Sequence, residues 1–191
     1  QYKVDRLEQA DKLNPEQKAT RMMKEIQEAL HLEKLPLTIE CFDNSNLQGT
    51  NPVSSMSCFI DCKPAKREYR HFNIKTVAGP NDFASMEEVI KRRYTRVLNE
   101  NLEMPDLIVI DGGKGQLSAA LKSLGELDLI GKVAIIGIAK RLEEIYFPGD
   151  DIPLYLNKNS ETLKVIQQLR DEAHRFGITH HRNKRSKNQL K

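Results

Sequence analysis

Residues 105–117, PDLIVIDGGKGQL, join an apolar run to a carboxylate and a glycine-rich turn. The run from Leu107 to Ile110 is continuously apolar, which is typical of a strand that is buried on both faces of a sheet. Asp111 follows directly, and the turn then leads into a helical pattern. An aspartate at the carboxyl end of such a strand lies at the rim of a buried sheet, where α/β folds bind their ligands. The segment therefore predicts an α/β fold with Asp111 in a candidate site.

The elements on both sides of this segment complete the plan. Toward the N-terminus, the patterns predict a helical segment over 4–35 with a break at Pro15, strands over 37–43, 52–62 and 67–75, and a helix over 85–101. Toward the C-terminus they predict a helix through Leu124, a strand over 132–139, short strands and turns over 144–156, and a last helix from Ser160 to about Phe176. This order predicts a mixed sheet, built from a three-strand meander plus parallel strands and flanked by helices.

The composition is that of an ordinary soluble globular protein. Of the 191 residues, 30% are charged and 39% are hydrophobic, as in typical globular domains. No apolar run approaches the about 20 residues that a membrane span needs, and the polar N-terminus does not resemble a secretory signal. Because the chain begins with Gln1, we expect it to be a fragment of a longer protein.

Three cysteines, Cys41, Cys58 and Cys62, occur without any C-x-x-C pair. An odd number without such a pair favours free thiols in a reducing compartment. A zinc site that also uses His71 is an alternative, but the spacing fits no zinc finger. Cys58 and Cys62 share strand parity with Met56, so we expect the cysteines to lie in the core.

Positive charge is concentrated in two clusters, although the formal net charge is only +3. The clusters lie at residues 91–96 and 180–191, and their basic residues are Lys91, Arg92, Arg93, Arg96, Arg182, Lys184, Arg185, Lys187 and Lys191. Such clusters suit contacts to nucleic-acid phosphates. A solvated helix face and a disordered tail would account for the same charges, and charge alone favours that interpretation.

The glycine turn at residues 112–115 fails two tests for nucleotide binding. A P-loop requires a glycine at the position of Ile108 and a serine or threonine at the position of Gly115. The dinucleotide fingerprint requires a third glycine where Ser118 stands. Glycine amides and Lys114 at the start of a helix still predict a cradle for one phosphate.

Strand parity relates Asp111 to a second carboxylate, Asp43. Because side chains alternate between the faces of a strand, Asp43 shares a face with Cys41, and Asp111 shares a face with Val109. If the two strands pair in parallel, about 4.8 Å apart, the carboxylates meet over one edge of the sheet and suit a hard cation. The alternative is that both aspartates only cap turns.

His174 is a third candidate. On the predicted last helix it falls at the margin of an apolar stripe that includes Leu169 and Ala173. A lone marginal histidine is most often a packed or solvated side chain. The last helix must cover the sheet, however, and this favours a position of His174 at the rim.

Four motifs of the chain resemble the C-terminal endonuclease half of the UvrC family, the incision subunit of bacterial nucleotide excision repair. They are IECFDNSN at 39–46, AGPNDFASMEEVIKRRY at 78–94, IDGGKGQL at 110–117 and DEAHRFGITHHR at 171–182, in the order of the family. The resemblance implies a lead-in helical segment over 1–36, an endonuclease domain over 37–181 and a basic tail or linker over 182–191. We expect the family's N-terminal nuclease domain and its helix-hairpin-helix module to lie outside this sequence.

The resemblance also implies a fold, a site and a reaction. The fold is ribonuclease H-like, with the first and fourth strands side by side. The catalytic triad and the metal ligands fall on Asp43, Asp111 and His174, and the cofactor is Mg²⁺ or Mn²⁺. Such an enzyme cuts damaged double-stranded DNA on the 5′ side of the lesion in the bacterial cytoplasm, together with UvrB and with UvrA upstream. Asp82 is a secondary candidate, which in an alternative interpretation only caps a helix.

The expected chemistry is metal-dependent phosphodiester hydrolysis by an endodeoxyribonuclease. Asp43 and Asp111 are the expected metal ligands, and His174 either completes the shell or acts as acid or base. Backbone contacts that do not depend on DNA sequence are expected from Arg92, Arg93, Lys114, Arg182, Lys184 and Arg185. Two alternatives remain open: a non-catalytic nucleic-acid-binding scaffold of the same fold, and a nucleotide-binding enzyme that uses the turn at 112–115.

Overall fold

The computed structural model describes residues 13–44, 52–77, 81–141 and 144–189, with side chains described as far as Thr179. Within these ranges, eight strands form one mixed sheet in the order β3-β2-β1-β5-β6-β7-β8, and β4 pairs with β2 beside this path. The strands are β1 Thr38–Asp43, β2 Val53–Ile60, β3 Lys63–Pro64, β4 Arg70–Asn73, β5 Leu107–Asp111, β6 Ala134–Ile138, β7 Glu144–Tyr146 and β8 Leu154–Tyr155. The helices are α2 Pro15–Ala29, α3 Asp82–Asn99, α4 Lys114–Glu126 and α5 Glu161–Gln189, with a 3-10 turn η1 at Lys66–Glu68.

The central strands confirm the predicted mixed sheet. β1 is antiparallel to β2 and parallel to β5, and β5 is parallel to β6. The register of the first parallel pair runs from Ile39 opposite Leu107 to Phe42 opposite Ile110. β1, the first strand in the chain, and β5, the strand that ends at Asp111, are therefore direct neighbours in the sheet, although residues 44–106 separate them in the chain.

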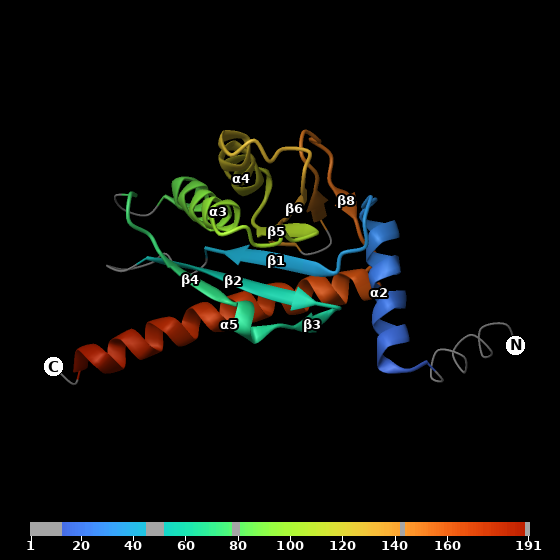
Figure 1. Cartoon of the computed structure of the whole chain (residues 1–191), viewed down its shortest axis with the longest axis horizontal. Helices are drawn as coiled ribbons and strands as arrows, with labels where there is room; N and C mark the ends of the chain where they lie inside the picture. Colours follow the sequence, from blue (N-terminus) through green and yellow to red (C-terminus); the bar gives the residue numbers. More distant parts are fainter. Residues whose placement is uncertain (1–12, 45–51, 78–80, 142–143, 190–191) are drawn as a thin grey trace, which may run out of the picture.

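Helices cover both faces of the sheet, and the sheet separates the core into two layers. Figure 1 shows α3 and α4 on one face and the long α5 running beneath the other. Alternation along β1 and β5 sends Phe42 and Ile110 into the layer under α3 and α4, and Cys41 and Val109 into the layer against α5. Strands buried on both faces explain the continuous apolar run that marks β5 in the sequence.

Several predicted boundaries differ from the structure. The last helix does not end near Phe176, because no proline follows and α5 continues to Gln189. The first predicted helix ends at Ala29 rather than at residue 35. It begins at Pro15, where the break was predicted, after a capping box between Asn14 and Gln17; residues 4–12 of that prediction lie outside the described residues. β2 ends at Ile60, because the next two residues turn the chain with positive φ.

The cysteines are free thiols. Cys41 and Cys58 are buried, as predicted, and burial raises the pKa of the Cys58 thiol to about 12. Cys62 is only partly buried, because it belongs to the turn after β2 and not to the strand. Among the helices in the described ranges, none has an apolar stretch that could cross a membrane.

Candidate active site

Asp43 and Asp111 end the two neighbouring parallel strands β1 and β5. The register places Phe42 opposite Ile110, so one further step sets the two aspartates side by side at the carboxyl edge of the sheet. Asp43 is only 2% exposed. Burial, and then the negative charge of Asp43, raise the pKa of Asp111 from 3.8 to about 6. The two carboxylates are thus close enough to repel each other in a poorly solvated position.

His174 approaches this pair from α5, the helix that covers the face of the sheet to which Asp43 and Asp111 belong by strand parity. Its Nδ1 lies 3.4 Å from Oδ2 of Asp43, and its side chain is 51% exposed. Ala173, the preceding residue on α5, is fully buried in the core. The margin position predicted from the apolar stripe is therefore confirmed: one edge of α5 packs on the sheet, and His174 faces the rim, where it reaches both Asp43 and solvent.

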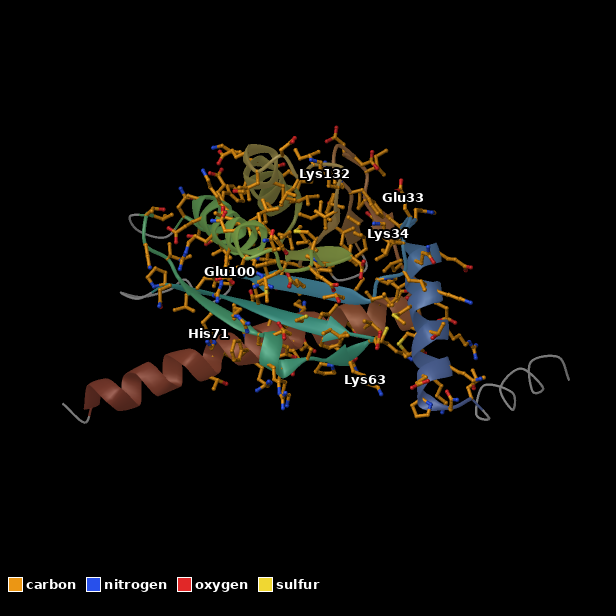
Figure 2. All side chains as sticks on the ribbon, in the orientation of Figure 1. Glu33, Lys34, Lys63, His71, Glu100 and Lys132 are labelled. Atoms are coloured by element: carbon orange, nitrogen blue, oxygen red, sulfur yellow. The ribbon has the colours of Figure 1, made fainter. Side chains whose placement is uncertain are left out.

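Polar contacts from β2 and β4 hold α5 in this place. The hydroxyls of Ser55 and Ser57 donate to the carbonyl oxygens of Ala173 and Leu169, at 2.8 and 2.7 Å. A ring nitrogen of His71 lies 2.7 Å from the carbonyl oxygen of Phe176, and the two rings stack with centroids 3.7 Å apart. Figure 2 shows His71 on the side of the sheet where α5 passes. These contacts bracket His174 and fix the helix turn that carries it.

The donor set at the rim fits a hard divalent cation. Carboxylate oxygens are the ligands that Mg²⁺ prefers, and Mn²⁺ accepts carboxylate and imidazole together. A carboxyl group whose proton affinity is raised by an acidic neighbour is stabilised by any cation that binds between the two. Among the described residues, no three histidine, cysteine, aspartate or glutamate side chains already form a cluster that could hold an ion. At the rim, Asp43 and Asp111 form a carboxylate pair, and the imidazole of His174 lies at the edge of this pair.

Comparison with known proteins assigns the chain to a family. The family described as the UvrC RNAse H endonuclease domain matches residues 27–178. The chain belongs to this family. The match begins within α2 and ends within α5, so it contains all of the strands and the three site residues. The ribonuclease H-like fold predicted from the four motifs is thereby confirmed.

Bacterial relatives agree with this assignment. UvrABC system protein C of Flavobacterium psychrophilum is 65% identical over 97% of this chain, and that of Porphyromonas gingivalis is 63% identical over 100% of it. The chain spans about a third of the length of these relatives, 31% and 32%.

A solved structure of Ciona intestinalis Endonuclease V with DNA aligns with a TM-score of 0.41 and 18% identity, over 84% of this chain and 69% of that one.

Arg170 joins the site, although sequence analysis did not select it. It lies four residues before His174, hence on the same face of α5. Its side chain is 30% exposed and donates to Oδ1 of Asp171 at 3.3 Å. After burial and Asp43, which raise the pKa of Asp111, the positive charge of Arg170 is the largest influence that lowers it. The spacing from His174 is the sequence signal that could have identified it.

The glycine turn shapes the rim beside Asp111. Gly112 has a φ of 150°, and a Cβ atom there would lie 2.3 Å from Cγ of Gln116, which folds back over it. Lys114 does not reach toward the carboxylates. Its Nζ lies 3.4 Å from Oδ1 of Asp151 and 5.7 Å from the ring centre of Tyr146. The lysine is half-exposed, and its exposed partner leaves it accessible to a phosphate.

The arginine and lysine side chains that were predicted to contact the DNA backbone fall into three groups. Arg92 is partly exposed and is held by Glu88 and by the carbonyl oxygen of Asn73. Arg93 is buried and paired with Glu40, so the structure contradicts its predicted contact with DNA. It lies on the apolar stripe of α3, four residues after Val89, and a count of helical positions would have shown this. Arg182, Lys184 and Arg185 belong to the helical backbone of α5, but their side chains lie outside the described part of the chain.

Asp82 begins α3 but does not cap it. The side chain of Asn81 accepts the hydrogen bond from the amide of Ala84 at 3.1 Å and so provides the cap. Asn44, which follows Asp43, donates from Nδ2 to the carbonyl oxygen of Asp82 at 3.2 Å. The start of α3 is therefore tied to the end of β1.

A cavity of about 860 Å³ lies away from this site, at the amino edge of the parallel strands. Its walls include apolar residues such as Leu30, Pro105 and Ile152. The labelled side chains of Glu33, Lys34 and Lys132 in Figure 2 mark this end of the molecule and line the cavity. The carboxylates and His174 are not among its walls, so this cavity is separate from the candidate active site.

Proposed function

We propose that this chain is a divalent-metal-dependent endodeoxyribonuclease that makes the 5′ incision in the damaged strand during nucleotide excision repair. The observation that carries the proposal is the pair Asp43 and Asp111 on adjacent parallel strands, with Nδ1 of His174 3.4 Å from Asp43. Membership in the UvrC RNase H endonuclease family supports it. Damaged double-stranded DNA is the proposed substrate, UvrB the proposed partner with UvrA upstream, and the bacterial cytoplasm the proposed location.

Asp43 and Asp111 would hold Mg²⁺ or Mn²⁺, and His174 would complete the coordination or exchange a proton with water or the leaving group. When bound, the ion polarises the scissile phosphate and lowers the pKa of the attacking water. Arg170 supplies a fixed positive charge from the same helix face as His174. Such a charge suits a phosphate group that gains negative charge as the water attacks.

The contacts of this chain also explain why the reaction would not depend on base sequence. The carboxylates, the histidine and the arginine all address the phosphate and the water, and none of these groups needs to read a base edge. Lys114, on the first turn of α4, would contact a neighbouring phosphate. A repair nuclease that must act in any sequence requires recognition of this kind.

A reconstituted incision assay tests the proposal. Full-length protein carrying Asp43→Ala, Asp111→Ala or His174→Ala is combined with UvrA, UvrB and an end-labelled duplex that bears one lesion. Each variant should lose the 5′ cut and keep the 3′ cut, which we assign to the other nuclease domain of the longer protein. Circular dichroism checks the folding of each variant. A folded Asp43→Ala protein that makes the 5′ cut at the normal rate would refute the assignment.

A thermal-shift measurement separates this proposal from the two alternatives. Manganese should raise the melting temperature, because it binds the folded carboxylate pair and not the unfolded chain. Asp43→Asn should abolish the shift. A non-catalytic scaffold would respond to duplex DNA but not to manganese, and a nucleotide-binding enzyme would respond to a mononucleotide. A manganese shift that survives Asp43→Asn would place the metal elsewhere.

A further inference from the structure

Phe83 is an exposed aromatic side chain at the start of α3. It lies three residues before Met86, on the helix face that elsewhere packs into the core through Met86, Val89 and Ile90. Those three side chains are fully buried, whereas Phe83 is 55% exposed. The apolar stripe of α3 therefore extends past the edge of the sheet and ends in a phenyl ring at the surface.

Two contacts place this ring beside the candidate active site. The hydrogen bond from Asn44 to the carbonyl oxygen of Asp82 joins the residue before Phe83 to the residue after Asp43. The ring itself packs against Gly115, on the first turn of α4, four residues after Asp111. The start of α3 is thus tied to the residue that follows β1, and the ring of Phe83 packs on the first turn of α4, which follows β5, on the α3 and α4 side of the rim.

Gly115 leaves the room that the ring occupies. A Cβ atom at this position would lie 2.6 Å from both Cε1 and Cζ of Phe83, which is closer than real Cβ contacts allow. The far end of the ring is therefore held against the first turn of α4, while more than half of the residue stays exposed. An aromatic ring fixed at its tip and open to solvent is preorganised to stack, because binding would immobilise little that is still free.

We propose that Phe83 is a base-stacking residue, on which one base of the DNA strand stacks while a neighbouring phosphate lies at Asp43 and Asp111. The proposal rests on the proposed function. It adds a contact to a base, whereas the carboxylates, His174, Arg170 and Lys114 would contact the phosphates or the water. Every base has an aromatic face, so stacking holds the strand without selecting its sequence. The contact would fix which phosphate of the strand reaches the carboxylate pair.

The absence of tryptophan from the chain makes a direct test possible. Phe83→Trp introduces a single tryptophan, which is excited selectively above the absorption of the tyrosines and whose emission is quenched when a base stacks on it. Tyr155→Trp is the matched control, because Tyr155 is also exposed, at 65%, and lies on β8 at the far edge of the sheet. Both variants are prepared in the Asp43→Asn background and titrated with a single-stranded oligonucleotide and with an abasic strand of equal length and charge.

The normal oligonucleotide should quench the emission of Phe83→Trp, the abasic strand should not, and Tyr155→Trp should respond to neither. Phe83→Ala should weaken binding of the normal strand about tenfold and leave the salt dependence unchanged, because no charge is lost. Phe83→Tyr, which keeps an aromatic face, should bind as the unsubstituted chain does.

Binding without quenching of Phe83→Trp, or unchanged affinity of a folded Phe83→Ala, would overturn the stacking contact while the proposed function stands. A ring that serves a partner protein instead of DNA would give this result. If the unsubstituted chain binds neither strand, stacking is overturned as well, and the incision assay then decides separately whether the proposed function fails with it.

Discussion

Two groups of buried carboxylates lie on opposite faces of β1, and they differ in how their charge is compensated. The Glu40 cluster consists of Glu40, Arg93 and Tyr94. Arg93 donates to one oxygen of Glu40 at 2.7 Å, and the hydroxyl of Tyr94 donates to the other at 2.8 Å. All three residues are buried. Burial lowers the pKa of Arg93, but its hydrogen bond to Glu40 and the charge of Glu40 leave that pKa above its usual value.

In the site cluster, formed by Asp43, Asp111, His174 and Arg170, two acids lie side by side instead of one acid between two buried donors. The groups beside them, the His174 imidazole and the Arg170 guanidinium, are partly exposed. A buried charge with a dedicated partner is satisfied and has no use for a ligand. A pair of like charges at a rim gains free energy when a cation binds, and this is the difference that we expect between a metal-binding carboxylate and a structural one on the same strand.

The largest effects should come from the site cluster. His174→Ala should slow the 5′ incision by about 10²–10⁴-fold if the imidazole acts as acid or base, whereas the members of the Glu40 cluster are buried and should affect the rate little when folding is preserved. Single-turnover incision rates measure the effect, and Asp43→Ala/Asp111→Ala should be scarcely slower than either single variant, because residues that act as one unit are not additive. A normal rate for folded His174→Ala would leave the carboxylate pair without a histidine.

Removing the charge of Glu40 should lower the stability of the fold, whereas the substitutions in the site cluster should lower the incision rate. Glu40→Gln leaves Arg93 buried without its counter-charge, so we expect a loss of about 3–5 kcal/mol in the free energy of unfolding. Asp43→Asn, on the other face of the same strand, should be neutral or stabilising in metal-free buffer, because it removes a repulsion. Urea denaturation of both variants checks the contrast. Equal destabilisation by the two would show that both clusters are structural.

The pH dependence of stability should reveal the repulsion between the two acids of the site cluster. The pKa of Asp111 is about 6 in the folded protein and 3.8 when unperturbed, so between these values the folded state holds a proton that the unfolded state has lost. Stability should therefore fall as the pH rises from about 4 to above 6 in metal-free buffer, by up to about 3 kcal/mol at 1.4 kcal/mol per pKa unit.

Comparison with Asp111→Asn isolates this contribution. The difference in unfolding free energy between the unsubstituted chain and Asp111→Asn should change across this pH range and then stay constant above it. Manganese at neutral pH should remove most of the penalty. A difference that does not vary with pH would mean that Asp111 titrates normally and that its neighbour does not repel it.

The smallest effect concerns a single surface lysine. Lys114→Ala should weaken binding of duplex DNA only a few-fold, on the order of one phosphate contact, and lower the salt slope by about 1. Lys132→Ala is the matched control, because Lys132 is similarly exposed and lies beside the cavity at the amino edge. Fluorescence anisotropy at several salt concentrations measures both. Identical slopes for the two variants would exclude Lys114 from the DNA interface.

Much of the site can be predicted from local patterns. The apolar run before Asp111 indicates a strand buried on both faces, and parity assigns Asp43 and Asp111 to the same face of their strands. The same positional counting on α5 places His174 at the edge of the apolar stripe. Each of these inferences uses only the period of one element. They lead to a correct element order and to three candidate residues whose catalytic role stays a prediction.

Local sequence patterns are enough to predict which polar side chains stand at the ends of apolar elements, because strand and helix periods are properties of the local backbone. How each charge is compensated depends on the tertiary structure. Arg93 and Arg92 are neighbours in one basic run, yet one is buried against Glu40 and the other lies at the surface. Compensation depends on atoms that are more than fifty residues apart in the chain, and the packing of α3 and α5 on the two faces of the sheet brings them together or keeps them apart.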